Sequence, residues 1–303
     1  MLILVNGLPL FAKQIVEDMN AFQSEHRFVF CNTYYKRLDK LKFFLLMPFA
    51  SMCISVNGVT DDSAALNWVI QLRKKLILLW SGTDVLLALE RNSKQTMSRK
   101  YIDYALNATD SALLSSELDQ LQIPHVITYF KWLPLESLQK QTYNRIRVLS
   151  YVAKGKEDFY GWQTIRQAAI DNPLLDFVLV GTDGKDLSLP HNVTCLGWID
   201  KTKLTQLYKE CAIFLRLPKH DGFSLSVLEA IAYGAEVIWT TPMPSYVERW
   251  TEGQSINQII DKLVSQIEAR KMTSNFERQK ALVKQFSREN ILSGFLNTIN
   301  ATS

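Results

Sequence analysis

Two carboxylates, Asp221 and Glu229, stand eight positions apart in the part of the sequence that is richest in chemistry. Gly222 lets the backbone approach a ligand closely, and Ser224 is a residue type that commonly precedes a helix. A helix that begins there has unbonded N–H groups at Ser224–Val227, which attract an anion together with the helix dipole. Because a carboxylate can accept two hydrogen bonds from a diol, this arrangement predicts a nucleoside diphosphate sugar as the ligand. The alternative is an ordinary strand–helix unit in which Glu229 is solvated.

These residues lie in a chain whose short apolar runs alternate with amphipathic runs. The runs expected as strands are 2–5, 27–31, 54–56, 76–80, 111–115, 147–152, 175–180, 193–196, 212–215 and 236–240. The runs expected as helices are 11–22, 62–73, 100–108, 160–170, 201–210, 224–233 and much of the chain after 257. Strand–helix alternation predicts parallel sheets that are covered on both faces. We therefore expect an α/β protein of two doubly wound, Rossmann-like domains that face each other across a cleft, with ligands beyond the carboxyl ends of the strands.

The pattern restarts after a predicted linker at 130–144. We expect an N-terminal, acceptor-side domain at 1–135 and a C-terminal, nucleotide-sugar-binding domain at 145–285. The last helix, 286–303, is expected to cross back to the first domain.

The composition excludes several classes of protein. The net charge is only +4, and no nucleic-acid-binding motif is present, so we expect no nucleic-acid partner. The four cysteines have no Cys-x-x-Cys spacing and the four histidines are scattered, which argues against structural zinc and against a disulfide framework. The longest apolar stretch, 43–56, contains Pro48 and is shorter than the ~20 residues that span a bilayer. We expect a cytoplasmic protein.

The segment 215–238 resembles the donor-binding segment of GT-B glycosyltransferases, in particular of the large retaining group. The family pattern is Glu-Gly-Phe-Gly-Leu, three residues, then Glu-Ala, and the matching positions are Gly222, Phe223, Leu225, Glu229, Ala230 and Gly234. Asp221 takes the place of the first Glu, and Ser224 stands where the family often has Gly. The resemblance implies that Glu229 holds the ribose hydroxyls and Asp221 the hydroxyls of the donor sugar. It also implies that backbone amides near Phe223–Leu225 hold the diphosphate.

A second segment, 149–155, resembles the first strand of the family's donor domain. The basic residue that follows this strand is Lys154, and the resemblance implies that it neutralises the diphosphate as the sugar leaves. The family usually carries an Arg upstream, but that place is occupied by Leu149. Arg216 or Lys156 is the candidate to replace it, and ordinary surface charge is the alternative for Lys154.

A third segment, 193–199, resembles the part of the family beside which the nucleotide base packs. The resemblance implies a base contact from Trp198 or Ile199, and an aromatic face can stack on a pyrimidine. Packing in the core is the alternative for Trp198. His220 adjoins the predicted phosphate site, where it either donates a hydrogen bond to the donor or packs against the loop.

Two residues of the first domain are candidates for the acceptor side. Gly7 resembles the family's glycine at the floor of the cleft. Asp84 follows a predicted strand and can bind or polarise an acceptor hydroxyl, with helix N-capping as its alternative.

Together with these residues, the resemblance implies a metal-independent transferase without a cofactor. It would move a hexosyl unit from a nucleoside diphosphate sugar to a hydroxyl of a glycan, lipid-linked or cell-envelope acceptor, with retention. Asp221, Lys154 and His220 are the expected catalytic residues. No Asp-x-Asp follows a predicted strand, and no cluster of metal ligands is visible. The alternatives are a nucleotide-sugar epimerase, a phosphorylase, whose coenzyme lysine we cannot identify, and a non-catalytic GT-B subunit that partners an active transferase.

The segment 34–46 predicts a membrane contact. It combines four cations and one acid with aromatic residues and leucines, a composition that suits a helix on the anionic inner face of a membrane. The alternative is a helix with a solvated basic face that leads into a buried strand, with 43–47 in the interior.

Overall fold

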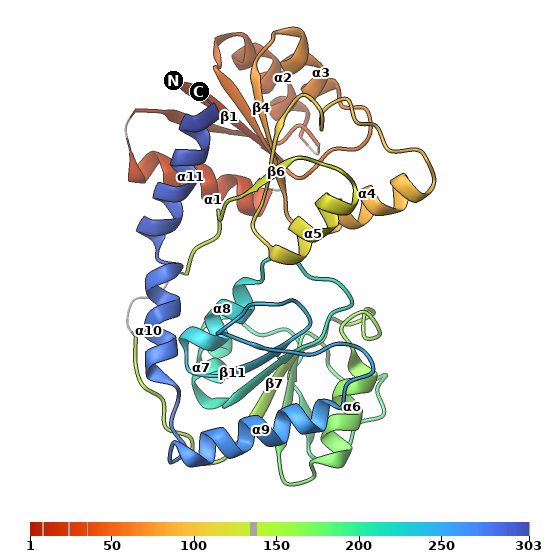
Figure 1. The fold of residues 1–303 in the computed structure, drawn as a ribbon, viewed down its shortest axis with the longest axis vertical. Coiled ribbons are helices and arrows are strands. Elements are labelled where there is room, and N and C mark those ends of the chain that lie inside the picture. Colours follow the sequence, from red (N-terminus) through yellow and green to blue (C-terminus); the bar gives the residue numbers. More distant parts are fainter. Residues whose placement is uncertain (8, 24, 35, 134–137, 303) are drawn as a thin grey trace. The chain divides into compact units, whose positions relative to one another are not determined.

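The chain folds into two compact units in the computed structural model, which describes residues 1–7, 9–23, 25–34, 36–133 and 138–302. Unit 1 comprises Met1–Trp132 and Ser287–Ser303, and unit 2 comprises Leu133–Phe286 (Figure 1). Part of the predicted linker, 134–137, lies outside the described residues.

Unit 1 is built on a parallel sheet of six strands in the order β2-β1-β3-β4-β5-β6. The strands are β1 (Leu2–Gly7), β2 (Arg27–Cys31), β3 (Met52–Val56), β4 (Lys75–Trp80), β5 (Leu106–Thr109) and β6 (His125–Ile127). The helices are α1 (Pro9–Phe22), α2 (Arg37–Leu46), α3 (Ala64–Gln71), α4 (Thr83–Ser93), α5 (Ala112–Gln120) and α11 (Arg288–Thr302), with a 3-10 turn at Met47–Phe49. The order reverses direction between β1 and β3, as in doubly wound folds.

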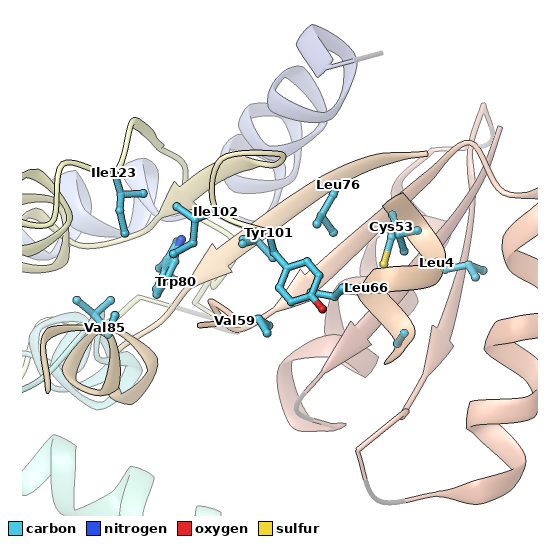
Figure 2. Packing of buried hydrophobic residues seen from close by; sticks show 14 of the residues in the cluster. Leu4, Cys53, Val59, Leu66, Leu76, Trp80, Val85, Tyr101, Ile102 and Ile123 are labelled. Atoms are coloured by element: carbon cyan, nitrogen blue, oxygen red, sulfur yellow. The ribbon is translucent and has the colours of Figure 1, made fainter. Parts of the chain in front are cut away.

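Successive strand residues of unit 1 enter two different cores because side chains alternate across a sheet. One core contains Leu4, Cys53 and Trp80, which pack with Val59 and Tyr101 (Figure 2). The other core lies under α1 and α11 and contains Ile3, Val5, Ile54 and Ile77, with Leu292, Phe295 and Ile299 from α11. Both faces of the central strands are therefore buried, which explains the continuous apolar runs in their sequences.

Two of the expected elements in unit 1 are wrong. The predicted helix at 100–108 is a turn followed by β5, and the predicted strand at 111–115 is the start of α5. Asn107 makes β5 unlike a strand in sequence, but its side chain accepts a hydrogen bond from Trp80 Nε1 at 3.1 Å and donates one to the Ile102 carbonyl at 3.0 Å. Tertiary contacts thus satisfy a polar side chain that local propensity disfavours in a strand.

Unit 2 is also built on a parallel sheet of six strands, in the order β12-β11-β10-β7-β8-β9. The strands are β7 (Arg147–Tyr151), β8 (Asp176–Val180), β9 (Val193–Cys195), β10 (Ile213–Arg216), β11 (Glu236–Trp239) and β12 (Glu248–Arg249). The helices are α6 (Trp162–Asp171), α7 (Lys201–Glu210), α8 (Leu225–Ala232), α9 (Ile256–Ala269) and α10 (Phe276–Gln285). The first three strands run outward from β7 and the last three from β10, which is the Rossmann order. The predicted class, α/β with two doubly wound parallel sheets, is confirmed.

A buried ion cluster attaches α9 and α10 to the sheet of unit 2. The Glu236 carboxylate at the start of β11 pairs with the guanidinium groups of Arg270 and Arg278. Gln279 of α10 donates to the Ala232 carbonyl at the end of α8, at 2.9 Å. The helix that carries Glu229 is therefore held at its carboxyl end by α10.

In the described ranges, no helix combines the length and the apolar character that crossing a bilayer requires.

Among the described residues of unit 1, Asp110, just after β5, and Lys131 form an ion pair that is removed from water. The Nζ–Oδ2 distance is 2.9 Å, and both side chains are buried. The ammonium group also lies over the rings of Phe11 and Phe130, at 5.0 and 5.1 Å from their centroids. Burial raises the pKa of Asp110 to about 6, although the charge of Lys131 acts in the opposite direction.

Lys131→Met should lower the free energy of unfolding at neutral pH by about 3–5 kcal/mol, because it leaves the Asp110 carboxylate buried without a counter-ion. Urea denaturation measures the change. The double variant Asp110→Asn/Lys131→Met is the control, since it buries no charge and should be within about 1 kcal/mol of the native protein. Equal losses in both variants would show that packing, and not charge, is responsible.

The same carboxyl group should make stability depend on pH. The pKa of Asp110 is raised from its ordinary 3.8 to about 6 in the folded chain, so its contribution to stability is complete below pH 4 and is lost as pH rises through about 6. Asp110→Asn lacks this titration. The free energy of unfolding of the native protein minus that of the variant should therefore fall between pH 4 and pH 7, and a difference that rises or stays constant would contradict the assignment.

Candidate functional site

The predicted ligand residues gather at the carboxyl edge of the unit 2 sheet, where the strand order reverses. Strands β7 and β10 are direct neighbours, and Ser150 pairs with Leu215. Each strand ends at the next residue, so Tyr151 and Arg216 emerge side by side. Ligands in doubly wound sheets bind beyond the strand ends at this reversal point.

Arg216 and Asp221 form a largely buried ion pair at this edge. Arg216 Nε donates to Asp221 Oδ2 at 2.7 Å, and Trp239 Nε1 donates to the same oxygen at 3.2 Å. Burial acts to lower the pKa of Arg216, but the Asp221 charge and hydrogen bond outweigh it and the pKa is raised. The guanidinium is thus held permanently charged. In the described part of the chain, Asp221 Oδ1 makes no hydrogen bond, so this oxygen is available to a ligand.

Aromatic rings surround the guanidinium of Arg216. Its Cζ lies 5.7 Å from the ring centroids of both Tyr151 and Tyr160, which pack edge to face at 5.0 Å. Trp198 continues the cluster at 6.1 Å from Tyr151 and is 77% exposed. Core packing therefore does not account for Trp198, and its indole is accessible to a planar ligand. Ile199, the other candidate for a base contact, is half-buried.

The start of α8 carries part of the predicted anion site. Ser224 is the N-cap residue, but its Oγ contacts Ser226 Oγ at 2.9 Å and caps no backbone N–H. The N–H of Val227 bonds to the Ser224 carbonyl at 3.2 Å, so the predicted group of unbonded amides is shorter than Ser224–Val227. The N–H groups of Leu225 and Ser226 make no hydrogen bond to other described residues.

The loop before α8 is closely packed. Gly222 is buried, and the buried Phe223 ring packs against Phe286 at a centroid distance of 5.2 Å. His220 is half-buried in the same loop.

Glu229 lies in the second turn of α8 and is buried, with only 8% of the residue exposed. Its Oε1 pairs with Nζ of Lys201, the first residue of α7. Lys201 is therefore a candidate site residue that the sequence pattern did not indicate. A cation at the start of a helix opposes the helix dipole, and this unfavourable placement is the signal that could have indicated it.

Lys154 lies in the loop after β7. Its Nζ is 3.2 Å from Asp183 Oδ2, and its backbone N–H donates to the Gly181 carbonyl at 3.1 Å. Gly181 in turn lies so close to Tyr151 that a Cβ would be 2.8 Å from the tyrosine ring. Lys154 is therefore tied to the loop beside the aromatic cluster, while its side chain stays half-exposed. Lys156 donates its backbone N–H to the Ala153 carbonyl in the same turn.

A cavity of about 580 Å³ opens beside Lys154, between α6 and the loop 183–188. Its lining includes Asp158, Trp162, Arg166 and Ser188 but neither Asp221 nor Glu229. Although most of its lining is charged or polar, the cavity does not include Arg216, Asp221 or Glu229, so the strand-end cluster is the better candidate for the donor site.

The two acceptor-side candidates have other roles in unit 1. Gly7 ends β1 with a positive φ of 138°, and a Cβ there would meet the Val56 carbonyl oxygen at 2.4 Å. Asp84 is buried, and its carboxylate accepts hydrogen bonds from the backbone N–H groups of Gly58, Ser81, Gly82 and Val85, at 2.6 to 3.2 Å. The N-cap of α4 is Gly82, so Asp84 stabilises this helix start from inside its first turn. Backbone packing thus explains both residues without a ligand.

The described residues contain no group of three or more His, Cys, Asp or Glu side chains that could hold a metal ion.

One known family matches part of unit 2. The family of glycosyl transferases group 1 matches residues 159–269, a segment that contains Arg216, Asp221 and Glu229. A search of curated proteins gives no match.

Solved structures share the fold of the chain. A glycosyltransferase from Rickettsia africae has a TM-score of 0.69 at 11% identity, over 99% of this chain and 98% of that one. UDP-GlcNAc 2-epimerase from Neisseria meningitidis, bound to UDP-GlcNAc, has a TM-score of 0.57 at 14% identity, over 99% of each chain. The pneumococcal O-GlcNAc transferase GtfA, in complex with UDP and GlcNAc, has a TM-score of 0.52 at 13% identity, over 83% of this chain and 56% of that one.

The present chain therefore spans little more than half of the pneumococcal enzyme. At identities this low the TM-scores show a shared fold and nothing beyond it, and that fold is GT-B. The chain thus has the GT-B fold predicted from its sequence, and its second unit contains a segment that matches the glycosyl transferases of group 1.

Proposed function

We propose that the protein is a glycosyltransferase that moves a hexosyl unit from a nucleoside diphosphate sugar to an acceptor hydroxyl, with retention. The observation that carries the proposal is the order of groups between β10 and α8. Asp221, the unbonded amides of Leu225 and Ser226, and Glu229 follow one another at the reversal point of the sheet, inside the family-matched segment.

Each group suits one part of the donor. Glu229 holds the ribose hydroxyls, the α8 amides hold the diphosphate and the exposed Trp198 ring stacks on the base. Without the donor, the Glu229 carboxylate is paired with the ammonium group of Lys201. When the donor binds, the ribose hydroxyls would replace Lys201 as hydrogen-bond donors to this carboxylate. The similar epimerase binds UDP-GlcNAc and the similar pneumococcal transferase is in complex with UDP and GlcNAc, which favours a UDP-sugar donor.

The chemical step requires stabilisation of the departing diphosphate. The bond from the anomeric carbon to the phosphate oxygen breaks, a bond to the acceptor oxygen forms on the same face, and the acceptor proton passes to the leaving phosphate. Arg216, held charged by Asp221, and Lys154 supply positive charge for the leaving group. The free Asp221 Oδ1 orients a sugar hydroxyl, and His220 donates to the donor from the same loop. No side-chain nucleophile and no metal takes part.

The acceptor is a hydroxyl of a glycan or of a lipid-linked or cell-envelope molecule. The chemistry of the donor site does not depend on which of these it is, because the leaving group is the same in each case.

Two alternatives have an observation in their favour. The likeness to the UDP-GlcNAc 2-epimerase covers 99% of both chains, which favours an epimerase of the same donor class. Asp221 Oδ2 already accepts hydrogen bonds from Arg216 and Trp239, and Leu149 stands where the family has Arg. These two features favour a non-catalytic subunit that binds a partner transferase. A transferase releases UDP when an acceptor is present, an epimerase releases a changed sugar, and a non-catalytic subunit releases neither.

Glu229→Ala should weaken the affinity for the cognate UDP-sugar about 10- to 100-fold, because hydrogen bonds to a charged group contribute about 1.5–3 kcal/mol. Isothermal calorimetry, after a screen of UDP-sugars, measures this. Glu210→Ala removes a half-exposed carboxylate from the same unit and should bind like the native protein. Native affinity in Glu229→Ala would remove the central assignment.

Transfer should continue in the presence of a strong chelator, because Arg216, Lys154 and helix amides are the proposed partners of the diphosphate. UDP release is followed before and after treatment with EDTA. Activity that disappears and returns only with Mg²⁺ or Mn²⁺ would assign the charge-stabilising role to a metal ion instead.

A further inference from the structure

Helix α2 of unit 1 contacts the core through one face only. Phe43 and Met47, the residue that follows the helix, are completely buried in the core of unit 1. The acid of the helix, Asp39, also turns inward, since its Oδ2 accepts a hydrogen bond from the Asn32 backbone N–H at 3.2 Å. These contacts define the inner face of α2, next to α3 in Figure 1.

The opposite face of α2 presents large apolar side chains to solvent. Leu38, Leu41 and Leu45 are 82%, 57% and 62% exposed, and Phe49 in the following 3-10 turn is 78% exposed. At roughly 100° per residue, the three leucines fall within about 60° of one another, on the side of the helix away from Phe43. A contiguous apolar patch on a protein surface commonly marks an interaction site.

Cations accompany this patch. Lys36, Arg37 and Lys40 are exposed and form no ion pair with other described residues. Lys42 is different because its Nζ donates to the Phe30 carbonyl at 3.0 Å. At 100° per residue, Arg37 and Lys42 flank the leucine stripe at about 70° on either side, whereas Lys40 and the half-buried Asp39 both lie about 130° from its centre. The charges nearest the leucines are therefore positive.

We propose that this α2 surface, composed of Leu38, Leu41, Leu45 and Phe49 with Lys36, Arg37 and Lys40, binds the surface of an anionic lipid bilayer. The leucines and Phe49 enter the boundary between headgroups and acyl chains, while the long cationic side chains reach lipid phosphates. Charge complementarity selects this occupant, because a helix with apolar side chains and cations but no outward acid matches an anionic interface. The inference does not rest on the proposed function.

The structure revises the segment predicted from sequence. Phe43 belongs to the core, and Phe44 is half-buried at 6.1 Å from the Trp68 ring. Lys42 bonds to Phe30, and Phe49, outside the predicted segment 34–46, joins the surface. Tyr35 of that segment lies outside the described residues.

Sedimentation with vesicles tests the proposal, with phosphatidylcholine vesicles that either contain or lack phosphatidylserine. The native protein should bind the anionic vesicles at low salt and lose binding as salt rises. Lys36→Gln/Arg37→Gln/Lys40→Gln should lower the partition coefficient about 100-fold, at about fivefold per cation. Leu41→Gln/Leu45→Gln should lower it at least tenfold on anionic vesicles.

Matched controls distinguish this surface from general properties of the chain. Lys140→Gln/Lys203→Gln/Lys271→Gln removes three exposed cations of unit 2, and Leu174→Gln removes a leucine that is 96% exposed there. The leucine control should bind normally, and the charge control should lose much less binding than the α2 variant. Glu229→Ala should also bind normally, so failure of the donor assignment leaves this test unaffected.

Three outcomes would overturn the proposal: no binding to anionic vesicles at low salt, native binding by both α2 variants, or self-association without vesicles that the leucine variant abolishes. The last would assign the surface to a second copy of the chain.

Discussion

The reversal of strand order between β7 and β10 is the constraint on which the candidate site depends. Because these strands are neighbours although some sixty residues separate them, Tyr151 and Arg216 leave the sheet at the same edge. The chain then continues outward from each strand in opposite directions, so no strand-to-helix connection crosses the space above the pair. The ion pair with Asp221 and the aromatic rings occupy the position that this topology leaves open.

The sequence predicted most of the fold because burial on both sheet faces produces apolar runs that are visible without alignment. In unit 2 every predicted strand and helix before residue 240 is confirmed, with small shifts of the boundaries. In unit 1 the predicted helix at 100–108 and strand at 111–115 are wrong, and the predicted ranges leave out α4 and β6. Strand β5 has four residues and includes the polar Asn107 and Thr109, so its identity as a strand depends on β4 beside it.

The two acids of the candidate site were predictable together because they are close in sequence. The spacing of Asp221 and Glu229 is a local pattern that follows from one strand, one loop and one helix. No local pattern indicates Lys201 and Trp239, because they contact these acids from other elements of unit 2. Which cation meets which acid is decided by the order of the strands and by the packing of α7 against α8, and neither property can be deduced from a single sequence.

Unit 1 is formed from two distant parts of the chain, and this has a consequence for synthesis on the ribosome. Residues 1–132 emerge first, but the core beneath α1 also needs Leu292, Phe295 and Ile299, which are translated after all of unit 2. The ion pair between Asp18 Oδ1 and Arg288 Nε, 3.4 Å apart, likewise forms only after Arg288 has been translated. During translation the second unit can therefore complete its fold while the first still exposes an apolar face. Until α11 emerges, this exposed apolar face makes the nascent chain prone to aggregation.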